Sequence, residues 1–90
     1  MFPRIKEVRY LRDYLLEFNF TDGRVEELDL GPYVVGRGGV FSLLEDPQYF
    51  RLVRVEPEAG TIVWPNGVDF CPDVLYSLAT HTPIHILEPA

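Results

Sequence analysis

Residues 16–23 read Leu-Glu-Phe-Asn-Phe-Thr-Asp-Gly, a run in which apolar and polar side chains alternate up to Asp22-Gly23. A period of two is typical of a strand with one buried face. Asp-Gly between two strand-like runs is a strong hairpin signal, because glycine accepts a positive φ. A second run with regularly placed apolar residues follows over 24–30. We therefore predict an antiparallel hairpin that pairs residues 14–20 with residues 24–30.

Two further segments extend this pattern on either side. Residues 4–11 are expected to form a preceding strand whose imperfect alternation indicates a bulge, which would complete a meander. Residues 51–56 alternate apolar and polar side chains, and residues 61–64 are rich in β-branched and aromatic residues. Glu58-Ala59-Gly60 lies between them and predicts a turn. These two segments form the second predicted hairpin.

Short helices are predicted between and after the hairpins. Residues 33–39 contain three glycines and are expected to form a loop, and residues 40–44 have the apolar spacing of a short helix. Asp46-Pro47 is typical of an N-cap followed by proline in the first turn, and a C-terminal helix is predicted from about Pro72. Strands and helices are mixed without βαβ alternation, which indicates an α+β fold. We expect one domain over residues 1–90, with an antiparallel sheet of two hairpins and short helices.

Composition limits the class of protein. Ninety residues, 47% of them hydrophobic, suffice for one core. The single cysteine, Cys71, excludes an intramolecular disulfide, which suits a reducing compartment. No apolar stretch reaches the length of a signal peptide or a membrane span. We therefore expect a soluble, cytoplasmic protein without membrane contact.

The net charge of −6 is unevenly distributed along the chain. Residues 55–90 contain five acids and no Lys or Arg, whereas the preceding residues carry all eight basic residues and nine acids. Because binding to phosphate backbones depends on Lys and Arg, we expect no direct nucleic-acid binding by this chain alone. The acidic part is instead suited to attract a basic protein.

Several residues are of types that can bind metals or carry out catalysis. His81 and His85 have the i, i+4 spacing of two metal ligands, but Pro83 interrupts the helix that would align them. Cys71 lies between two acids that oppose thiolate formation. Asp69 and Asp73 are interpreted as partners of a turn and of a helix N-terminus rather than as a catalytic pair. We therefore assign no catalytic, metal-binding or cofactor-binding residue and expect no cofactor, and a non-catalytic role is favoured over an enzymatic one.

A candidate interaction surface combines acids of the C-terminal third with nearby aromatic residues, which often anchor protein interfaces. Core packing is the alternative role for these aromatic side chains, above all for the tryptophan. The candidate residues are Glu56, Glu58, Trp64, Asp73 and Tyr76.

The stretch Thr61–Asp69, which contains Trp-Pro-Asn-Gly, and the following Pro72–Tyr76 resemble the signature of the bacterial "domain of unknown function 2442" family. The resemblance extends over nearly the whole chain to about Tyr76. Further matching positions are Pro3-Arg4-Ile5, Val8, Asp22-Gly23, Asp29-Leu30, Val40-Phe41 and Leu44.

This resemblance implies an α+β domain with a curved antiparallel sheet and brings no catalytic residues with it. Some relatives carry an added helix-turn-helix domain, which we do not expect here because the 90-residue sequence ends too early for one. Others resemble members of suspected toxin–antitoxin pairs. Our leading hypothesis is a protein-binding module, the antitoxin-like member of a two-protein regulatory pair, whose partner is another small protein. The alternative is a ligand-sensing or scaffold domain without catalytic activity, and a homo-oligomer is left open.

Overall fold

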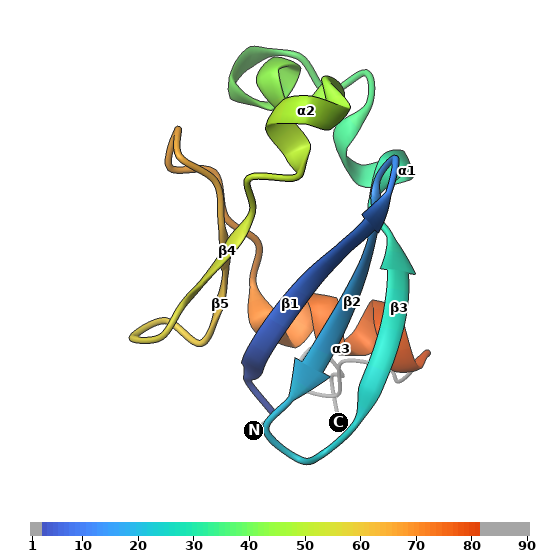
Figure 1. The fold of residues 1–90 in the computed structure, drawn as a ribbon, viewed down its shortest axis with the longest axis vertical. Coiled ribbons are helices and arrows are strands. Elements are labelled where there is room, and N and C mark those ends of the chain that lie inside the picture. The colour runs from blue at the N-terminus through green and yellow to red at the C-terminus, as the bar shows by residue number, and fades with distance from the viewer. Residues whose placement is uncertain (1–2, 82–90) are drawn as a thin grey trace, which may run out of the picture.

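The computed structural model describes residues 3–81. It begins with an antiparallel meander of β1 (Ile5–Arg12), β2 (Leu15–Phe20) and β3 (Val25–Asp29), in the order β1-β2-β3 (Figure 1). The predicted hairpin is confirmed. Gly23 has a φ of +92°, a conformation that favours glycine, and the Asp22 carboxylate accepts a hydrogen bond from the Arg24 amide at 2.9 Å.

The predicted irregularity of the first strand is also confirmed. The register between β1 and β2 shifts twice, between Ile5 and Glu7 and again between Tyr10 and Arg12. An extra residue on one strand of an antiparallel pair bends that strand and increases its twist. The bulges therefore explain why the alternation along β1 is imperfect in the sequence.

Three short helical segments follow the meander: α1 (Gly31–Val34), the 3₁₀ helix η1 (Gly39–Glu45) and α2 (Pro47–Phe50). The two predicted helices are confirmed as η1 and α2, and Asp46 caps α2 by accepting a hydrogen bond from the Gln48 amide at 2.9 Å. The prediction of a loop throughout residues 33–39 is wrong at its start, because α1 continues to Val34. The proline in its first turn suits a helix start, and the buried Val34 side chain fixes the turn to the core.

The second hairpin consists of β4 (Arg54–Glu56) and β5 (Thr61–Val63) and forms a sheet of its own. The strand predicted over residues 51–56 is shorter in the structure. The amides of Leu52 and Val53 donate to carbonyls of α2 and close a turn there instead. The C-terminal helix α3 (Pro72–Thr80) begins at the predicted proline, with Cys71 at its N-cap position.

The two sheets are joined at the start of β1. The Ile5 amide donates to the Gly60 carbonyl at 2.9 Å, and the Arg4 guanidinium donates to the Ala59 carbonyl at 3.2 Å. Within residues 3–81, β4 contacts β1 but is not hydrogen-bonded to it in a common sheet. The second hairpin therefore lies beside the outer edge of β1 (Figure 1).

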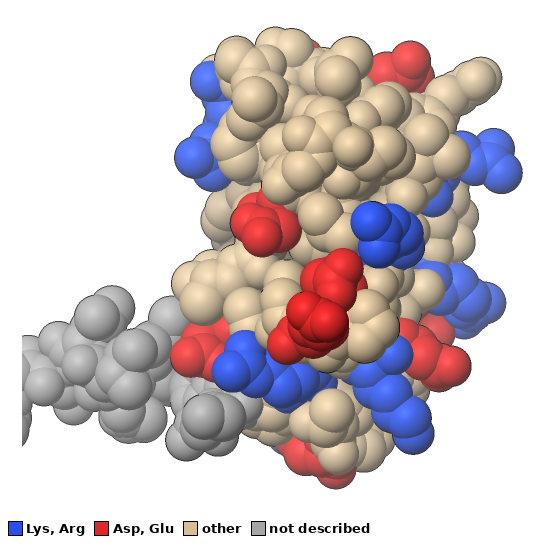
Figure 2. Space-filling view, turned by 90° about the vertical axis from the view of Figure 1, so that its left-hand side faces the viewer, with Lys and Arg blue, Asp and Glu red and all other residues tan. Residues whose placement is uncertain are grey.

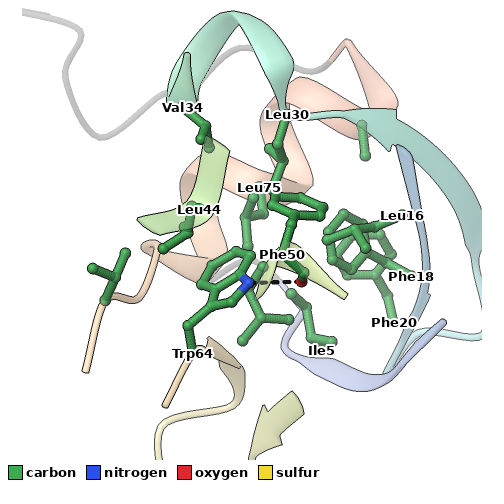
Figure 3. Packing of buried hydrophobic residues seen from close by; sticks show 13 residues of the cluster. Ile5, Leu16, Phe18, Phe20, Leu30, Val34, Leu44, Phe50, Trp64 and Leu75 are labelled. Atoms are coloured by element: carbon green, nitrogen blue, oxygen red, sulfur yellow. Dashed lines mark hydrogen bonds between the residues drawn. The ribbon is translucent and has the colours of Figure 1, made fainter. Parts of the chain in front are cut away.

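The hydrophobic core lies between the meander, the second hairpin and α3 (Figures 1 and 3). Trp64 is its largest member, and its indole Nε1–H donates to the Phe50 carbonyl at 2.8 Å, drawn as a dashed line in Figure 3. The meander contributes alternate residues of β2 to this core, and the intervening Glu17 and Asn19 lie on the opposite face. The buried core residues are Ile5, Leu16, Phe18, Phe20, Leu30, Val34, Leu44, Phe50, Ile62, Trp64, Val68, Leu75 and Ala79.

Candidate functional site

The predicted interaction residue Trp64 does not lie on the surface. Its side chain is 1% exposed and packs against the rings of Phe50 and Phe70 at centroid distances of 5.3 and 5.9 Å. The indole donor is already used by the Phe50 carbonyl. A role as an interface anchor is therefore corrected to core packing, the alternative that the sequence left open.

Tyr76 lies half-buried on α3 and connects this helix to the turn between β2 and β3. Its ring meets Phe20 edge-to-face at 4.9 Å, and its hydroxyl donates to the Asp22 carboxylate at 2.8 Å. The Arg24 amide, followed by the Tyr76 hydroxyl, holds the pKa of Asp22 below its ordinary value of 3.8. The same carboxylate raises the pKa of Tyr76 above its ordinary value of 10.0. Tyr76 thus fixes the hairpin turn to α3.

This contact predicts an acid-dependent loss of stability. Because the pKa of Asp22 is lowered in the folded state, its contribution is fully present above 3.8 and is lost as pH falls through the folded-state value. We expect urea unfolding of Asp22→Asn at a series of pH values to show less acid destabilisation than the wild type. Tyr76→Phe removes the hydroxyl donor but keeps the Arg24 amide, so its acid destabilisation should lie between those of the wild type and Asp22→Asn. Parallel stability curves of the wild type and Asp22→Asn in the acid range would contradict this assignment.

The predicted acids Glu56, Glu58 and Asp73 lie on two elements. The first two belong to the β4–β5 hairpin and its turn, whereas Asp73 lies in the first turn of α3. Two basic side chains lie at this hairpin: Arg54, within β4 itself, pairs with Glu56 at 3.8 Å, and Arg4, which precedes β1, donates to the Ala59 carbonyl in the turn. Figure 2 shows basic and acidic side chains intermixed over the lower half of this face. The charge asymmetry of the sequence is therefore partly balanced in space.

Within residues 3–81, His81, Cys71, Asp69 and Asp73 do not come together as a metal site. Residues 3–81 contain no group of three or more His, Cys, Asp and Glu side chains that could hold a metal ion. The Cys71 side chain is exposed and makes no capping hydrogen bond. In the turn before α3, Asn66 rather than Asp69 accepts a backbone hydrogen bond, from the Val68 amide at 3.2 Å. His85 and most of the tail 80–90 lie outside the described residues.

A surface groove of about 620 Å³ lies between β1 and β4. It is lined by Lys6, Glu7, Val8, Arg9, Glu17, Asn19, Val53, Arg54 and Val55. Its charged side chains are of both signs, and Arg9 is paired with Glu17 at 3.1 Å. Across the described part of the chain, every buried side-chain nitrogen or oxygen has a hydrogen-bond partner. The described interior therefore presents no unpaired polar side-chain atom for a small ligand.

The surface feature that the sequence analysis missed is the outer edge of β3. Two hydrogen bonds show which residues of β3 face β2. The Phe20 amide donates to the Arg24 carbonyl, and the Leu30 amide donates to the Tyr14 carbonyl. Even-numbered residues of β3 bond to β2, so the backbone groups of odd-numbered residues point away from it. No strand among residues 3–81 pairs with this outer edge.

The side chains of β3 alternate between half-buried and exposed positions, and the three exposed ones are Val25, Glu27 and Asp29. Glu27 lies directly opposite Glu17 of β2, which in turn lies opposite Arg9 of β1. Glu17 is paired with Arg9, whereas no ion pair within residues 3–81 involves Glu27, so the row across the sheet ends in a negative charge. The run Val-Glu-Glu-Leu-Asp could have indicated an edge, since edge strands often carry charges.

These features define a class: a small α+β domain whose antiparallel meander has one edge beside a second hairpin and one edge without a neighbouring strand among residues 3–81. The chain belongs to the family described as "Protein of unknown function (DUF2442)", which it matches over residues 5–81. A crystal structure of the "Putative DNA Binding Protein NE0471" from Nitrosomonas europaea is similar, with 26% sequence identity and a TM-score of 0.79. The match covers 90% of this chain and 51% of that one, so this chain spans about half the length of its structural relative.

A search of curated proteins gives no match. Among the helices of residues 3–81, none combines the length and apolar character that a membrane span requires.

Proposed function

We propose that this domain is a protein-binding module. The open edge of β3 is the observation that carries this proposal. An exposed strand edge presents unpaired backbone donors and acceptors, and these are a template for pairing with another chain. The edge is also acidic, which favours a partner of the opposite charge.

The acids of the C-terminal third support the same function from a distance. Glu58 is exposed, and Asp73 is partly exposed in the first turn of α3. These acids lie away from the β3 edge, but negative charge on the domain still raises the local concentration of a cationic partner and accelerates encounter. We place the domain in a two-protein regulatory pair, as its antitoxin-like member, with a small basic protein as the partner.

DNA binding is the competing function suggested by the description of the Nitrosomonas europaea protein, which is about twice as long as the matched region. The basic side chains of this chain are poorly placed for it. On β1, Lys6 and Arg9 flank Glu7, and the Arg9 guanidinium is paired with Glu17. Neutralisation of phosphates requires several free cations on one surface, and the acidic β3 edge opposes it.

The proposal is tested by recovering and reconstituting a complex. The full chain is cross-linked in its native host cells, the captured protein is purified, and binding is measured by calorimetry at several salt concentrations. We expect a stoichiometric protein complex that weakens as salt rises, because charge attracts the partner. A variant with Glu56→Gln, Glu58→Gln and Asp73→Asn should keep its fold and show a flatter salt dependence.

Two results would overturn the proposal. One is the absence of any reconstituted protein complex. The other is submicromolar binding of a duplex DNA fragment at physiological salt by the isolated chain, together with failure of the captured protein to bind.

A further inference from the structure

The meander has two edges, and only one of them can receive a full-length strand. Beside β1 lies the second hairpin, which is held there by the bond from the Ile5 amide to the Gly60 carbonyl. The outer edge of β3 has no such neighbour among residues 3–81. In Figure 1, β3 forms the right-hand border of the sheet, and α3 passes behind the sheet rather than along this edge.

The backbone of this edge is already in the geometry that strand addition needs. The amides and carbonyls of Val25, Glu27 and Asp29 point outward, because their even-numbered neighbours bond to β2. An added antiparallel strand would pair residue by residue with these three positions. No rearrangement of β3 is required for it to become an inner strand.

The side chains of the edge specify the chemistry of the added strand. Cross-strand neighbours on one face interact directly, with opposite charges favourable and like charges unfavourable. The row Arg9, Glu17, Glu27 therefore leaves a negative charge that a basic residue on the next strand would balance. A second basic residue would face Asp29, and an apolar residue would face Val25, whose side chain is 52% exposed.

The same side chains disfavour a second copy of this chain as the occupant. Full-length antiparallel pairing of two β3 edges places Glu27 opposite Glu27 of the other copy. Like charges directly opposite one another destabilise a strand pair. The acidic edge thus resists self-association, a known use of charge on edge strands, while it remains complementary to a basic strand.

We propose that β3 binds an extended, basic segment of a partner protein, which adds to the meander as a fourth, antiparallel strand with basic residues opposite Glu27 and Asp29. This inference rests on the proposed protein-binding function and names the chemical class of the partner. Backbone hydrogen bonds would hold the segment, and the charge pairs would fix its register.

The test uses a capped probe peptide, Thr-Lys-Thr-Lys-Thr-Val-Thr, whose two lysines and valine match Asp29, Glu27 and Val25. It is titrated into the full chain and followed by NMR. We expect the largest shift changes and slowed amide exchange at those three residues of β3. A peptide that is N-methylated at the two lysines and the valine keeps its charge but loses the donors, and it should bind at least about tenfold more weakly, as the loss of one to three hydrogen bonds implies.

Charge reversal provides the matched control on the protein side. Glu27 is exposed on an edge, so Glu27→Lys should retain the fold. This variant should bind the lysine peptide about tenfold more weakly than the wild type does, and it should bind the corresponding glutamate peptide more tightly. Val25→Pro removes an outward-facing donor without touching the β2–β3 ladder, and it should weaken binding more than Val25→Ala.

The inference fails if the lysine peptide does not bind, if it perturbs another surface, or if N-methylation leaves its affinity unchanged. The outcome is separable from that of the proposed function. A captured protein that binds the wild type and Glu27→Lys equally well would leave the protein-binding function standing and refute the β3 edge as its site.

Discussion

Trp64→Ala is expected to lower the free energy of unfolding by about 3–5 kcal/mol, the range for removal of a buried aromatic side chain. Trp64 is 1% exposed and packs against the rings of Phe50 and Phe70, so its removal leaves a cavity in the core. It also leaves the Phe50 carbonyl without its 2.8 Å donor. Urea unfolding measured by circular dichroism provides the comparison.

Two matched variants separate these contributions. Trp64→Phe retains part of the ring volume but not the donor, and we expect a loss between those of the wild type and the alanine variant. Leu43→Ala removes a side chain that is 51% exposed and should change stability by less than about 0.5 kcal/mol. If Trp64→Ala unfolds like Leu43→Ala, the assignment of Trp64 to the core is wrong.

Gly60→Ala is expected to lower the free energy of unfolding by about 2–4 kcal/mol, because it combines positive-φ strain with overpacking. Gly60 has a φ of +69°, and an added Cβ would lie 2.8 Å from the Cβ of Arg4. That atom is next to the backbone and cannot move aside as the end of a flexible side chain can. Thermal and urea unfolding of the variant would measure the cost.

Gly39→Ala is the control for this substitution. Gly39 has a comparable φ of +57°, but no atom lies within 4 Å of the position that a Cβ would occupy. It should therefore show only the backbone cost of about 1 kcal/mol. Equal losses for the two variants would mean that the contact with Arg4 contributes nothing to the junction of the two sheets.

The junction at Gly60 also bears on function. It holds the second hairpin beside β1, so that the two borders of the meander are different. If this junction loosens, the edge of β1 becomes a second site for strand addition. Gly60→Ala therefore provides a way to ask whether the proposed partner binding depends on β3, the edge of the meander without a neighbouring strand among residues 3–81.

Local chemistry explains which parts of the fold could be predicted. The β2–β3 hairpin follows from alternation around Asp22-Gly23, and the N-terminus of α2 follows from Asp46 before a proline. In both cases the determining groups lie within a few residues of one another. Two predictions were wrong in part: the loop over 33–39, where α1 continues to Val34, and the strand over 51–56, which is shorter in the structure. In both places the conformation depends on contacts outside the local segment. Val34 is buried by the core, and Leu52 is committed to the turn after α2.

The interaction surface shows the same division. The sequence placed Trp64 and the acidic third together because they are neighbours along the chain. In space, Trp64 lies in the core, and Arg4, which is distant in the sequence, reaches the turn of the β4–β5 hairpin, where Arg54 of β4 pairs with Glu56. Tyr76 reaches Asp22, a contact across 54 positions that no local pattern could indicate.

The sequence by itself determined the α+β class, both hairpins, the start of α3 and the family resemblance, because turn residues, caps and periodicity act over short distances. Only the tertiary structure decided which strand edge has no neighbouring strand among residues 3–81. Alternation reveals the two faces of a strand, but it carries no information on whether another strand lies beside it. That depends on where the second hairpin packs, and its attachment to β1 through Ile5 and Gly60 leaves the acidic edge of β3 exposed.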